Sequence, residues 1–532
     1  MFSGYFIKDN DLYRDKEGLE QLDTLLQTNS CTEVIAGLNG SFRFIIESES
    51  HTHFGIDHFG GYSLFYKSRP SLEIFTNPNS LSSLSDIQDD QLCTLLASGF
   101  CFGDKTIFRD IKECLPGRLY SYDKSADKLT SKQWFQVDFS KQRKRSKAEL
   151  SDLFFSLIPN NLSKTTLALT GGIDSRLLLS LFKRKGIQLE TLTYGTRDNS
   201  DIKLARQIAQ ESGLDHNAYY FDELNLTSFF QDDLLDKFLT SGFLGRSLPF
   251  ESDWVVSNLI KDSTQWISTG FTSFWLRAPY QDYLPVRDNS SLVNKLVNSH
   301  CQQTLISSSS FRDTLIASIN ESMSHYNSED YDRSYDRWNI ENRQHKYIIN
   351  TCNNYRYNNI EVFMPLFDRR VMTFLNNTSR EQRLEQKLFM ETIISNIFTG
   401  NDAYLKKIPS TNPKFTNNLQ KNKLSPNKLR NKILHLDKHN LNRIFRRPNN
   451  PMYGIIRSVL LQSPDYLSLK VDQAFPNIKE TISLLYDLNL TKSANHLNWL
   501  KNKKVVQLNL LGIEIIGFLV DKFSTVLSST EK

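Results

Sequence analysis

Cysteine is scarce in this sequence, and its arrangement excludes several kinds of site. None of the six cysteines belongs to a C-x-x-C pair, which argues against a zinc knuckle or a dithiol redox centre. An excess of one charge is missing too. The formal net charge is only +5 over 532 residues, so the overall balance does not indicate a nucleic-acid partner. The cysteines are Cys31, Cys93, Cys101, Cys114, Cys301 and Cys352.

Long apolar runs are missing as well. The first residues, MFSGYFIKDNDLYRD, show no basic region followed by an apolar block, so we expect no secretory signal. The longest late apolar stretch, residues 508–520, is interrupted by Gly512, Glu514 and Gly517, which leaves it too short to span a bilayer. We therefore expect a cytoplasmic protein, and the length predicts about two to four domains.

Residues 1–138 contain short segments rich in aromatic and β-branched residues, separated by Gly, Asn, Asp and Ser. This pattern predicts antiparallel strands joined by turns. A charged stretch, residues 139–150, follows and is expected to be a linker. The strand-like segments are GYFI, SFRFIIES, THFGIDHF, YSLFYK, LEIFTN and RLYSYDK.

Residues 151–415 begin with an alternation of strand-like and helix-like segments. TTLALT, LETLTYG and HNAYYF are typical of strands, and the two helical segments between them end at Gly186 and Gly213. Such an alternation predicts a parallel sheet with crossover helices. Helical patterns prevail from about residue 227, and we expect residues 416–532 to form a basic insertion and a helical extension.

The stretch LALTGGIDSRLLLSLF lies where the first of these strands meets the first helix. Ligands bind at the carboxyl ends of strands in open parallel sheets. Gly171 and Gly172 can adopt a positive φ and let a ligand approach the backbone. A helix that begins near Ser175 offers unpaired N–H groups to a phosphate. Asp174 suits a magnesium ion carried by the phosphates, and Ser175 can cap the helix or bond a phosphate oxygen.

Two common phosphate motifs are missing from this position. There is no G-x-x-x-x-G-K-[ST] and no G-x-G-x-x-G, so neither a Walker A loop nor a dinucleotide fingerprint is present. The alternative is a structural turn in which the glycines only make a sharp bend. The order of strand, [ST]-G-G-x-D-S, helix and strand favours the phosphate-binding interpretation.

TGGIDS resembles the pyrophosphate loop of N-type ATP pyrophosphatases, and the chain over roughly residues 1–415 resembles the asparagine synthetase family. The resemblance implies an α+β Ntn-hydrolase-like domain, then an α/β parallel-sheet PP-loop domain with a mostly helical C-terminal part. In that family ATP activates a carboxylate as an acyl-adenylate, and an amine then forms an amide. The other supporting stretches are SDIKLARQIAQESGLDHN, LNGSFRF, GIDHFGGYSLFYK, TIFRDIKECLPG and PLFDRRVMTFL.

The resemblance also implies which residues bind ATP and Mg²⁺. Asp174 is the expected metal ligand. Arg176 stands where the family has a small residue, and its guanidinium could stabilise phosphate charge; the alternative is a solvated first-turn arginine. The expected ATP-binding residues are Thr170, Gly171, Gly172, Asp174, Ser175, Gly195 and Gly270.

Lysines complete the expected catalytic set, because the family uses a lysine to stabilise the transition states. Lys387 in EQKLFMETI is the nearest match, and Lys407 is the runner-up. A helix-surface lysine is the alternative for each. The stretch RWNIENRQHKY resembles a helix that lines the site in TGGxDSR-type members, although packing explains its aromatic residues equally well. The residues concerned are Trp338, Arg343, Gln344 and Tyr347.

Residues 1–138 differ from the family at the position of the catalytic nucleophile. Members that hydrolyse glutamine carry a cysteine directly after the initiator methionine, whereas this chain has Phe2. Phenylalanine has no nucleophilic atom. We therefore expect a truncated, inactive glutaminase-like domain that serves as scaffold or substrate wall. β-Lactam synthetases and lasso peptide cyclases, which lack this cysteine too, use an amine in the substrate itself.

Residues 151–415 differ from the family at its second acidic motif. The corresponding stretch is ISTGFTSFWLR, in which Phe274 and Trp275 occupy the acidic positions. One magnesium contact is thus missing or supplied elsewhere. Asp253 and Asp282 flank the stretch and could substitute, but an ordinary surface acid is the simpler interpretation of each.

Residues 406–447 are rich in Lys and Arg, with Asn and Pro between the charges. A solvated insertion is the first interpretation, and contact with an anionic membrane or polyanion is the second. Nucleic acid comes third, because aromatic residues for base stacking are sparse. A homodimer is one assembly to test.

Two functions stay open on the sequence. The intact loop favours an adenylate-forming ligase, which takes a small-molecule, carrier or peptide carboxylate and an amine donor. The missing acidic motif favours a non-catalytic nucleotide-binding or scaffold protein. tRNA thiolation or lysidine formation uses the same loop type, but the glutaminase-like front half belongs to another branch. Asparagine itself is not a secure substrate assignment.

Overall fold

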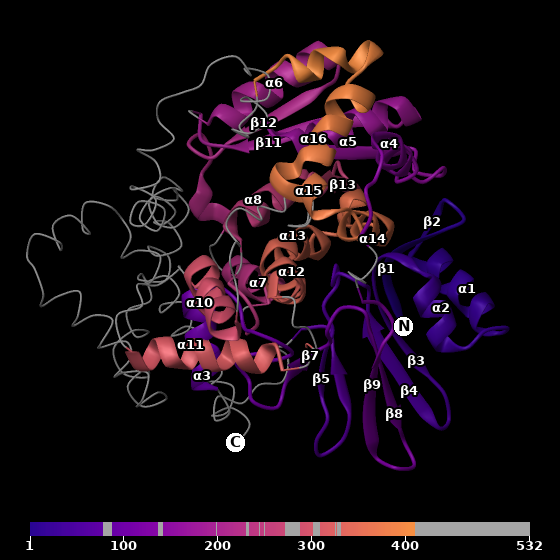
Figure 1. Ribbon diagram of the computed structural model, residues 1–532, viewed down its shortest axis with the longest axis vertical. Coiled ribbons are helices and arrows are strands. Elements are labelled where there is room, and N and C mark those ends of the chain that lie inside the picture. Colours follow the sequence, from indigo (N-terminus) through magenta and orange to yellow (C-terminus); the bar gives the residue numbers. More distant parts are fainter. Residues whose placement is uncertain are drawn as a thin grey trace, which may run out of the picture.

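Antiparallel and parallel sheets occupy different parts of the computed structural model. In Figure 1 the parallel sheet and its helices lie at the top, and the antiparallel sheets lie at the lower right. The model describes residues 1–77, 88–136, 142–197, 199–229, 233–243, 245–248, 250–271, 288–301, 309–324, 326 and 331–409.

The N-terminal part is built on a six-stranded antiparallel sheet in the order β2-β1-β3-β4-β8-β9, beside a three-stranded sheet in the order β6-β5-β7. This confirms the predicted antiparallel strands. The strands are β1 (Phe2–Lys8), β2 (Asp11–Arg14), β3 (Asn39–Glu47), β4 (His51–Ile56), β5 (Phe65–Lys67), β6 (Glu73–Phe75), β7 (Lys112–Glu113), β8 (Arg118–Asp123) and β9 (Lys128–Gln133).

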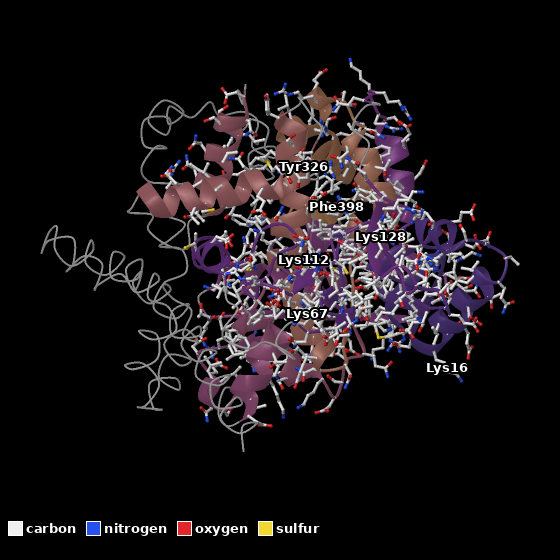
Figure 2. All side chains as sticks on the ribbon, turned by 90° about the horizontal axis from the view of Figure 1, so that it is seen from below. Lys16, Lys67, Lys112, Lys128, Tyr326 and Phe398 are labelled. Atoms are coloured by element: carbon white, nitrogen blue, oxygen red, sulfur yellow. The ribbon has the colours of Figure 1, made fainter. Side chains whose placement is uncertain are left out.

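Three helices of this part were not predicted, α1 (Asp15–Leu26), α2 (Cys31–Gly37) and α3 (Asp89–Ser98). The start of α2 has a recognisable signal, because Ser30 and Glu33 form a reciprocal capping box. Lys16 on α1 is largely exposed and lies at the outer edge of the N-terminal part (Figure 2).

The second part confirms the predicted parallel sheet. Its five strands run in the order β12-β11-β10-β13-β14 and pair in parallel throughout. The crossover helices α5 (Ile173–Lys185) and α6 (Ser200–Ser212) end at left-handed Gly186 and Gly213, as expected. The strands are β10 (Lys164–Ala168), β11 (Gln188–Gly195), β12 (His216–Tyr220), β13 (Trp266–Thr269) and β14 (Glu361–Phe363).

Helices make up most of the remainder. Helix α4 (Lys147–Phe155) begins inside the stretch 139–150 that we expected to be a linker, and Ser146 caps it. In the described residues no helix is both long and apolar enough to cross a membrane. The other elements include α7 (Asp233–Ser241), α8 (Glu251–Ile260), α10 (Asn289–His300), α11 (Ser309–Ser322), α12 (Tyr331–Trp338), the π-helix η5 (Asn339–Ile348), α13 (Cys352–Tyr357), α14 (Arg369–Asn376), α15 (Arg380–Arg383), α16 (Lys387–Thr392) and the 3₁₀ helix η10 (Gly400–Lys406).

One hydrophobic core joins the two parts. Tyr5 and Phe59 of the N-terminal part belong to the same buried cluster as Leu167 and Ile173 of the parallel-sheet part. A buried ion cluster crosses the same boundary. Glu113 lies 2.9 Å from Arg246 Nε and 3.0 Å from His345 Nε2, and all three side chains are buried. The N-terminal part therefore supports the parallel-sheet part directly.

Candidate nucleotide-binding site

The turn 170–172 lies at the carboxyl edge of the parallel sheet. It follows β10, and Gly172 is the N-cap of α5, which begins at Ile173 rather than near Ser175. The neighbouring strand β13 ends level with β10, because Ala168 pairs with Thr269. Strand β11, on the other side, ends at Gly195. Three of the expected binding segments thus meet at one edge, where parallel sheets place ligands.

The glycines of this turn are needed for space and not for a special φ. Neither Gly171 nor Gly172 has a positive φ, so the expected conformational reason is wrong. A Cβ on Gly171 would lie 2.6 Å from Leu204 Cδ1 and 3.0 Å from Asp201 Oδ1. Helix α6 therefore packs so closely against the turn that a side chain at position 171 would require Leu204 and Asp201 to move.

Hydroxyl groups fix the shape of the turn. The backbone N–H of Thr170 donates to Ser175 Oγ at 3.2 Å, and Ser175 Oγ donates to the Gly172 carbonyl oxygen at 3.3 Å. The Gly172 N–H in turn donates to Thr170 Oγ1 at 3.1 Å. Ser175 is buried, and these bonds hold the turn in one conformation at the start of α5.

Gly270 and Gly195 lie where another part of the chain approaches closely, the backbone of Ser175 at Gly270 and the Asn199 side chain at Gly195. A Cβ on Gly270 would lie 2.9 Å from the backbone nitrogen of Ser175, so the end of β13 lies directly against the first turn of α5. Gly195 has a φ of +151° and lies near Asn199, the N-cap of α6. Nucleotide contacts of both glycines remain predictions.

Asp201 is a residue of this site that the sequence analysis did not single out. Its Oδ1 accepts a hydrogen bond from the Gly171 N–H at 3.0 Å. Asn199 Oδ1 accepts from the Asp201 N–H at 2.8 Å and so fixes the first turn of α6. The available signal was the first aspartate of SDIKLAR, within a stretch that resembles a family segment.

Asp174 has the position expected of a magnesium ligand. It is 5% exposed and lies in the first turn of α5, directly after the glycine turn. No group of three or more His, Cys, Asp or Glu that could hold a metal is found among the described residues. Magnesium that accompanies nucleotide phosphates needs only one or two carboxylates. A single carboxylate beside the glycine turn fits that requirement, and magnesium binding by Asp174 remains a prediction.

Arg176 is placed differently from either sequence interpretation. Its side chain is 0% exposed, so it is no solvated arginine. The guanidinium donates to the carbonyl oxygens of Gly171 at 3.0 Å, Leu405 at 2.9 Å and Ile408 at 2.8 Å, and to that of Pro409. It lies behind the turn, bound to backbone. We therefore do not retain a direct phosphate contact for it.

The two candidate lysines differ in their relation to the turn. Lys407 is exposed and immediately precedes Ile408, whose carbonyl oxygen Arg176 binds. Lys387 is also exposed, at the start of α16, but no hydrogen bond in the described part of the chain connects it to the turn. Only the segment that carries Lys407 is thus bound to the turn, through backbone carbonyl oxygens, and the catalytic role of either lysine remains a prediction.

Asp253 is a buried acid and not the surface residue that we considered. Its Oδ1 accepts hydrogen bonds from the hydroxyls of Tyr194 at 2.9 Å and Tyr355 at 3.2 Å. Burial raises the pKa of its carboxyl to about 6, although the tyrosine bonds act in the opposite direction. Phe274, Trp275 and Asp282 lie outside the described residues, as does all of 406–447 after Pro409.

The stretch RWNIENRQHKY is largely buried. Trp338 packs against Phe102 at a ring distance of 5.2 Å, and its Nε1 donates to Ser322 Oγ at 2.9 Å. Tyr347 belongs to the same hydrophobic cluster. Gln344 is buried and Arg343 is half-buried on the same element. These contacts favour packing as the role of the aromatic residues.

Phe2 occupies β1 as a packing residue. Its ring lies 5.6 Å from that of Phe6 and 5.8 Å from that of Phe42. The terminal ammonium of Met1 donates to the Ile45 carbonyl oxygen at 2.7 Å. The chain is therefore part of the sheet from Phe2 onwards, and the Phe2 ring packs within it.

The parallel sheet with this turn defines an α/β domain whose candidate ligand site lies at the carboxyl edge of the strands. Residues 163–389 match the model of the family described as Asparagine synthase. The match confirms the resemblance seen in the sequence. No curated protein sequence matches the chain.

Two solved structures are similar in part. Glutamine phosphoribosylpyrophosphate amidotransferase from B. subtilis, complexed with ADP and GMP, is 9% identical, with 41% of this chain and 70% of that chain covered and a TM-score of 0.19. Glutamine-dependent NAD+ synthetase from Acinetobacter baumannii, in complex with ADP, is 13% identical, with 49% and 65% covered and a TM-score of 0.19. At these TM-scores neither likeness carries an argument.

Proposed function

We propose that the chain is an ATP-dependent ligase that adenylates a carboxylate and then forms an amide, without glutaminase activity of its own. The observation that supports this most is the meeting of the turn 170–172, Gly270 and the first turn of α5 at one edge of the parallel sheet, within the residues that match the Asparagine synthase family. A helix N-terminus with an adjacent buried carboxylate suits the pyrophosphate of ATP accompanied by magnesium.

Each part of the turn then has a task. The Gly171 and Gly172 N–H groups already donate to Asp201 and Thr170, so the N–H groups of the first turn of α5 bind the phosphate oxygens. The hydroxyls of Thr170 and Ser175 keep the turn in shape. Asp174 would hold the magnesium ion. When bound, magnesium supplies positive charge that offsets the negative charge of the leaving pyrophosphate.

Lys407 supplies the remaining cation in this proposal. An ammonium group close to the phosphates stabilises charge that develops as the acyl-adenylate forms. The segment that carries Lys407 is bound to the back of the turn through Arg176. We rank Lys387 second, because it has no such connection among the described residues.

The N-terminal part acts as an Ntn-type scaffold in this proposal. Phe2 leaves it without the expected nucleophile, and the shared core and the Glu113–Arg246 pair fix it to the parallel-sheet part. The amine then comes from the substrate or from solution. A small-molecule, carrier or peptide carboxylate would each be compatible with the site.

A non-catalytic nucleotide-binding protein is the second candidate. The observation that favours it is the pair of aromatic residues, Phe274 and Trp275, at the positions of the second acidic motif. ATP–pyrophosphate exchange, assayed with a broad panel of carboxylic acids, distinguishes the ligase from the binding protein. MgATP binding is titrated on the same preparation. The ligase predicts exchange that requires one class of acid. ATP binding with no exchange over the whole panel would favour the binding protein.

A further inference from the structure

One face of α5 holds the segment 400–409. Arg176, Ser180 and Arg184 are four residues apart, so they lie on the same side of the helix. Ser180 Oγ donates to Asp402 Oδ2 at 2.5 Å, and Arg184 Nε lies 3.3 Å from the same oxygen. Arg176 binds the carbonyl oxygens at the far end of the segment.

A second helix adds to this attachment. Tyr404 OH lies 2.6 Å from Ser212 Oγ of α6 and accepts a hydrogen bond from Lys183 Nζ at 3.4 Å. Asp402, Leu405 and Ile408 are buried. The segment is thus fixed at its beginning, middle and end, while Lys407 itself stays exposed.

The segment 400–409 is attached to α5 partly through a buried charge, the guanidinium of Arg176. The four hydrogen bonds described above all go to carbonyl oxygens. Burial lowers the pKa of the guanidinium to about 10, with Asp201 acting in the opposite direction. It remains charged at neutral pH. A buried charge is expensive to maintain, so an apolar side chain would be the simpler way to pack a helix here. A planar fork, however, can bind several backbone oxygens at once.

The carbonyl oxygens that Arg176 binds belong to two separate segments of the chain. One is the carbonyl of Gly171 in the phosphate-binding turn, and three belong to Leu405, Ile408 and Pro409 around Lys407. One rigid group therefore sets the distance between the turn and the lysine segment. Lysine has a single flexible ammonium and could not bridge these carbonyls in the same way.

We propose that Arg176 is a positioning residue that docks the segment 400–409 on the Gly171 turn and so holds Lys407 beside the leaving pyrophosphate. This inference rests on the proposed function, since it assigns Lys407 to the adenylation step. Arg176 itself touches no substrate in this scheme. Nucleotide binding at the turn and docking of the segment should then stabilise each other.

The docking is tested with trypsin, which cleaves after Lys407. In the wild type, MgATP at about ten times its Kd should slow this cut by on the order of tenfold, because cleavage follows the undocked population. In R176Q the cut should be fast, and MgATP should change it little. R176K should resemble R176Q, because the charge alone does not rebuild the fork.

D402N provides a second variant in case R176Q folds poorly. It weakens the other end of the segment and leaves the guanidinium in place, so it should also accelerate the cut after Lys407. If well-folded R176Q and D402N are both cut as slowly as the wild type, with the same MgATP protection, the docking proposal is wrong.

The positioning role is tested by ATP–pyrophosphate exchange. R176Q and K407A should each slow exchange by about 100-fold, and the double variant should be no slower than K407A alone. MgATP affinity of R176Q should change by less than about threefold, which separates positioning from damage to the turn. K406A, a change at the neighbouring lysine, and K185A, on the exposed end of α5, should exchange like the wild type.

The positioning role would be wrong if the double variant lost the product of the two single losses in exchange rate. It would also be wrong if R176Q lost MgATP affinity by the same factor as exchange rate. A wild type that binds MgATP but exchanges with no acid would instead refute the proposed ligase function. The trypsin experiment then still decides whether Arg176 docks the segment.

Discussion

The carboxylate of Asp201 accepts a hydrogen bond from the backbone N–H of Gly171 at 3.0 Å. This bond connects the first turn of α6 to the turn between β10 and α5. It places an acid at the turn that we propose to bind phosphate, where the carboxylate fixes the peptide plane of Gly171. The first and second crossover helices of the sheet thus shape the candidate site together.

Removal of this bond should weaken nucleotide binding. We expect D201A to raise the Kd for MgATP by about tenfold, because the Gly171 peptide loses a charge-assisted hydrogen bond. D201N is the matched control, since its amide oxygen can still accept from the same N–H, and its Kd should stay close to that of the wild type. Calorimetric titration measures both. An unchanged Kd in D201A would show that the bond does not support the site.

A side chain at position 171 should be poorly tolerated. In G171A the new Cβ would clash with Leu204 Cδ1, and overpacking of this kind costs about 1–3 kcal/mol of unfolding free energy. MgATP binding should weaken as the turn moves. Gly37, where an added Cβ meets nothing within 4 Å, is the control. Urea unfolding should show G171A as clearly destabilised and G37A as unchanged or slightly more stable; equal stability of the two would contradict the packing argument.

Asp253 should make stability depend on pH. Its folded pKa, raised by burial to about 6, exceeds the unfolded value, so its stabilising contribution is present at low pH and is lost as pH rises through 6. Between pH 4.5 and 7.5 the wild type should lose about 2 kcal/mol relative to D253N. Urea unfolding of both proteins at the two pH values measures this difference. A difference of zero, or one of opposite sign, would show that the carboxyl titrates normally.

Glutamine hydrolysis should be absent. The ring of Phe2 packs against Phe6 and Phe42 and offers no nucleophile. Incubation with glutamine and ATP should release no more glutamate than a heat-killed control. Glutamate release that survives replacement of all six cysteines would reveal another nucleophile and contradict our account of the N-terminal part.

Local patterns predicted the glycine turn, the parallel sheet and the ends of α5 and α6. These features depend on residues close in sequence, such as the strand before Thr170 and the left-handed Gly186. The partners of Arg176 could not be predicted in this way. Leu405 lies 229 residues further along the chain, and nothing in TGGIDSR shows that the arginine faces inwards.

The burial of Asp253 could not be predicted from the sequence either, because its partners are distant in sequence. Its sequence neighbours, ESDWVV, fit an exposed helix as well as a buried one. Only the arrangement of β11 and α13 brings the hydroxyls of Tyr194 and Tyr355 to its carboxylate. A buried acid was therefore mistaken for a candidate surface residue.

The most direct test of the account is a calorimetric titration of MgATP into the wild type and D174N, with the magnesium concentration varied. We expect the wild type to bind ATP in a magnesium-dependent manner, and D174N to bind more weakly with little dependence on magnesium. D215N, a change to an exposed aspartate before β12, should behave like the wild type. Unchanged affinity and unchanged magnesium dependence in a folded D174N would contradict the assignment of Asp174 as the metal ligand at this turn.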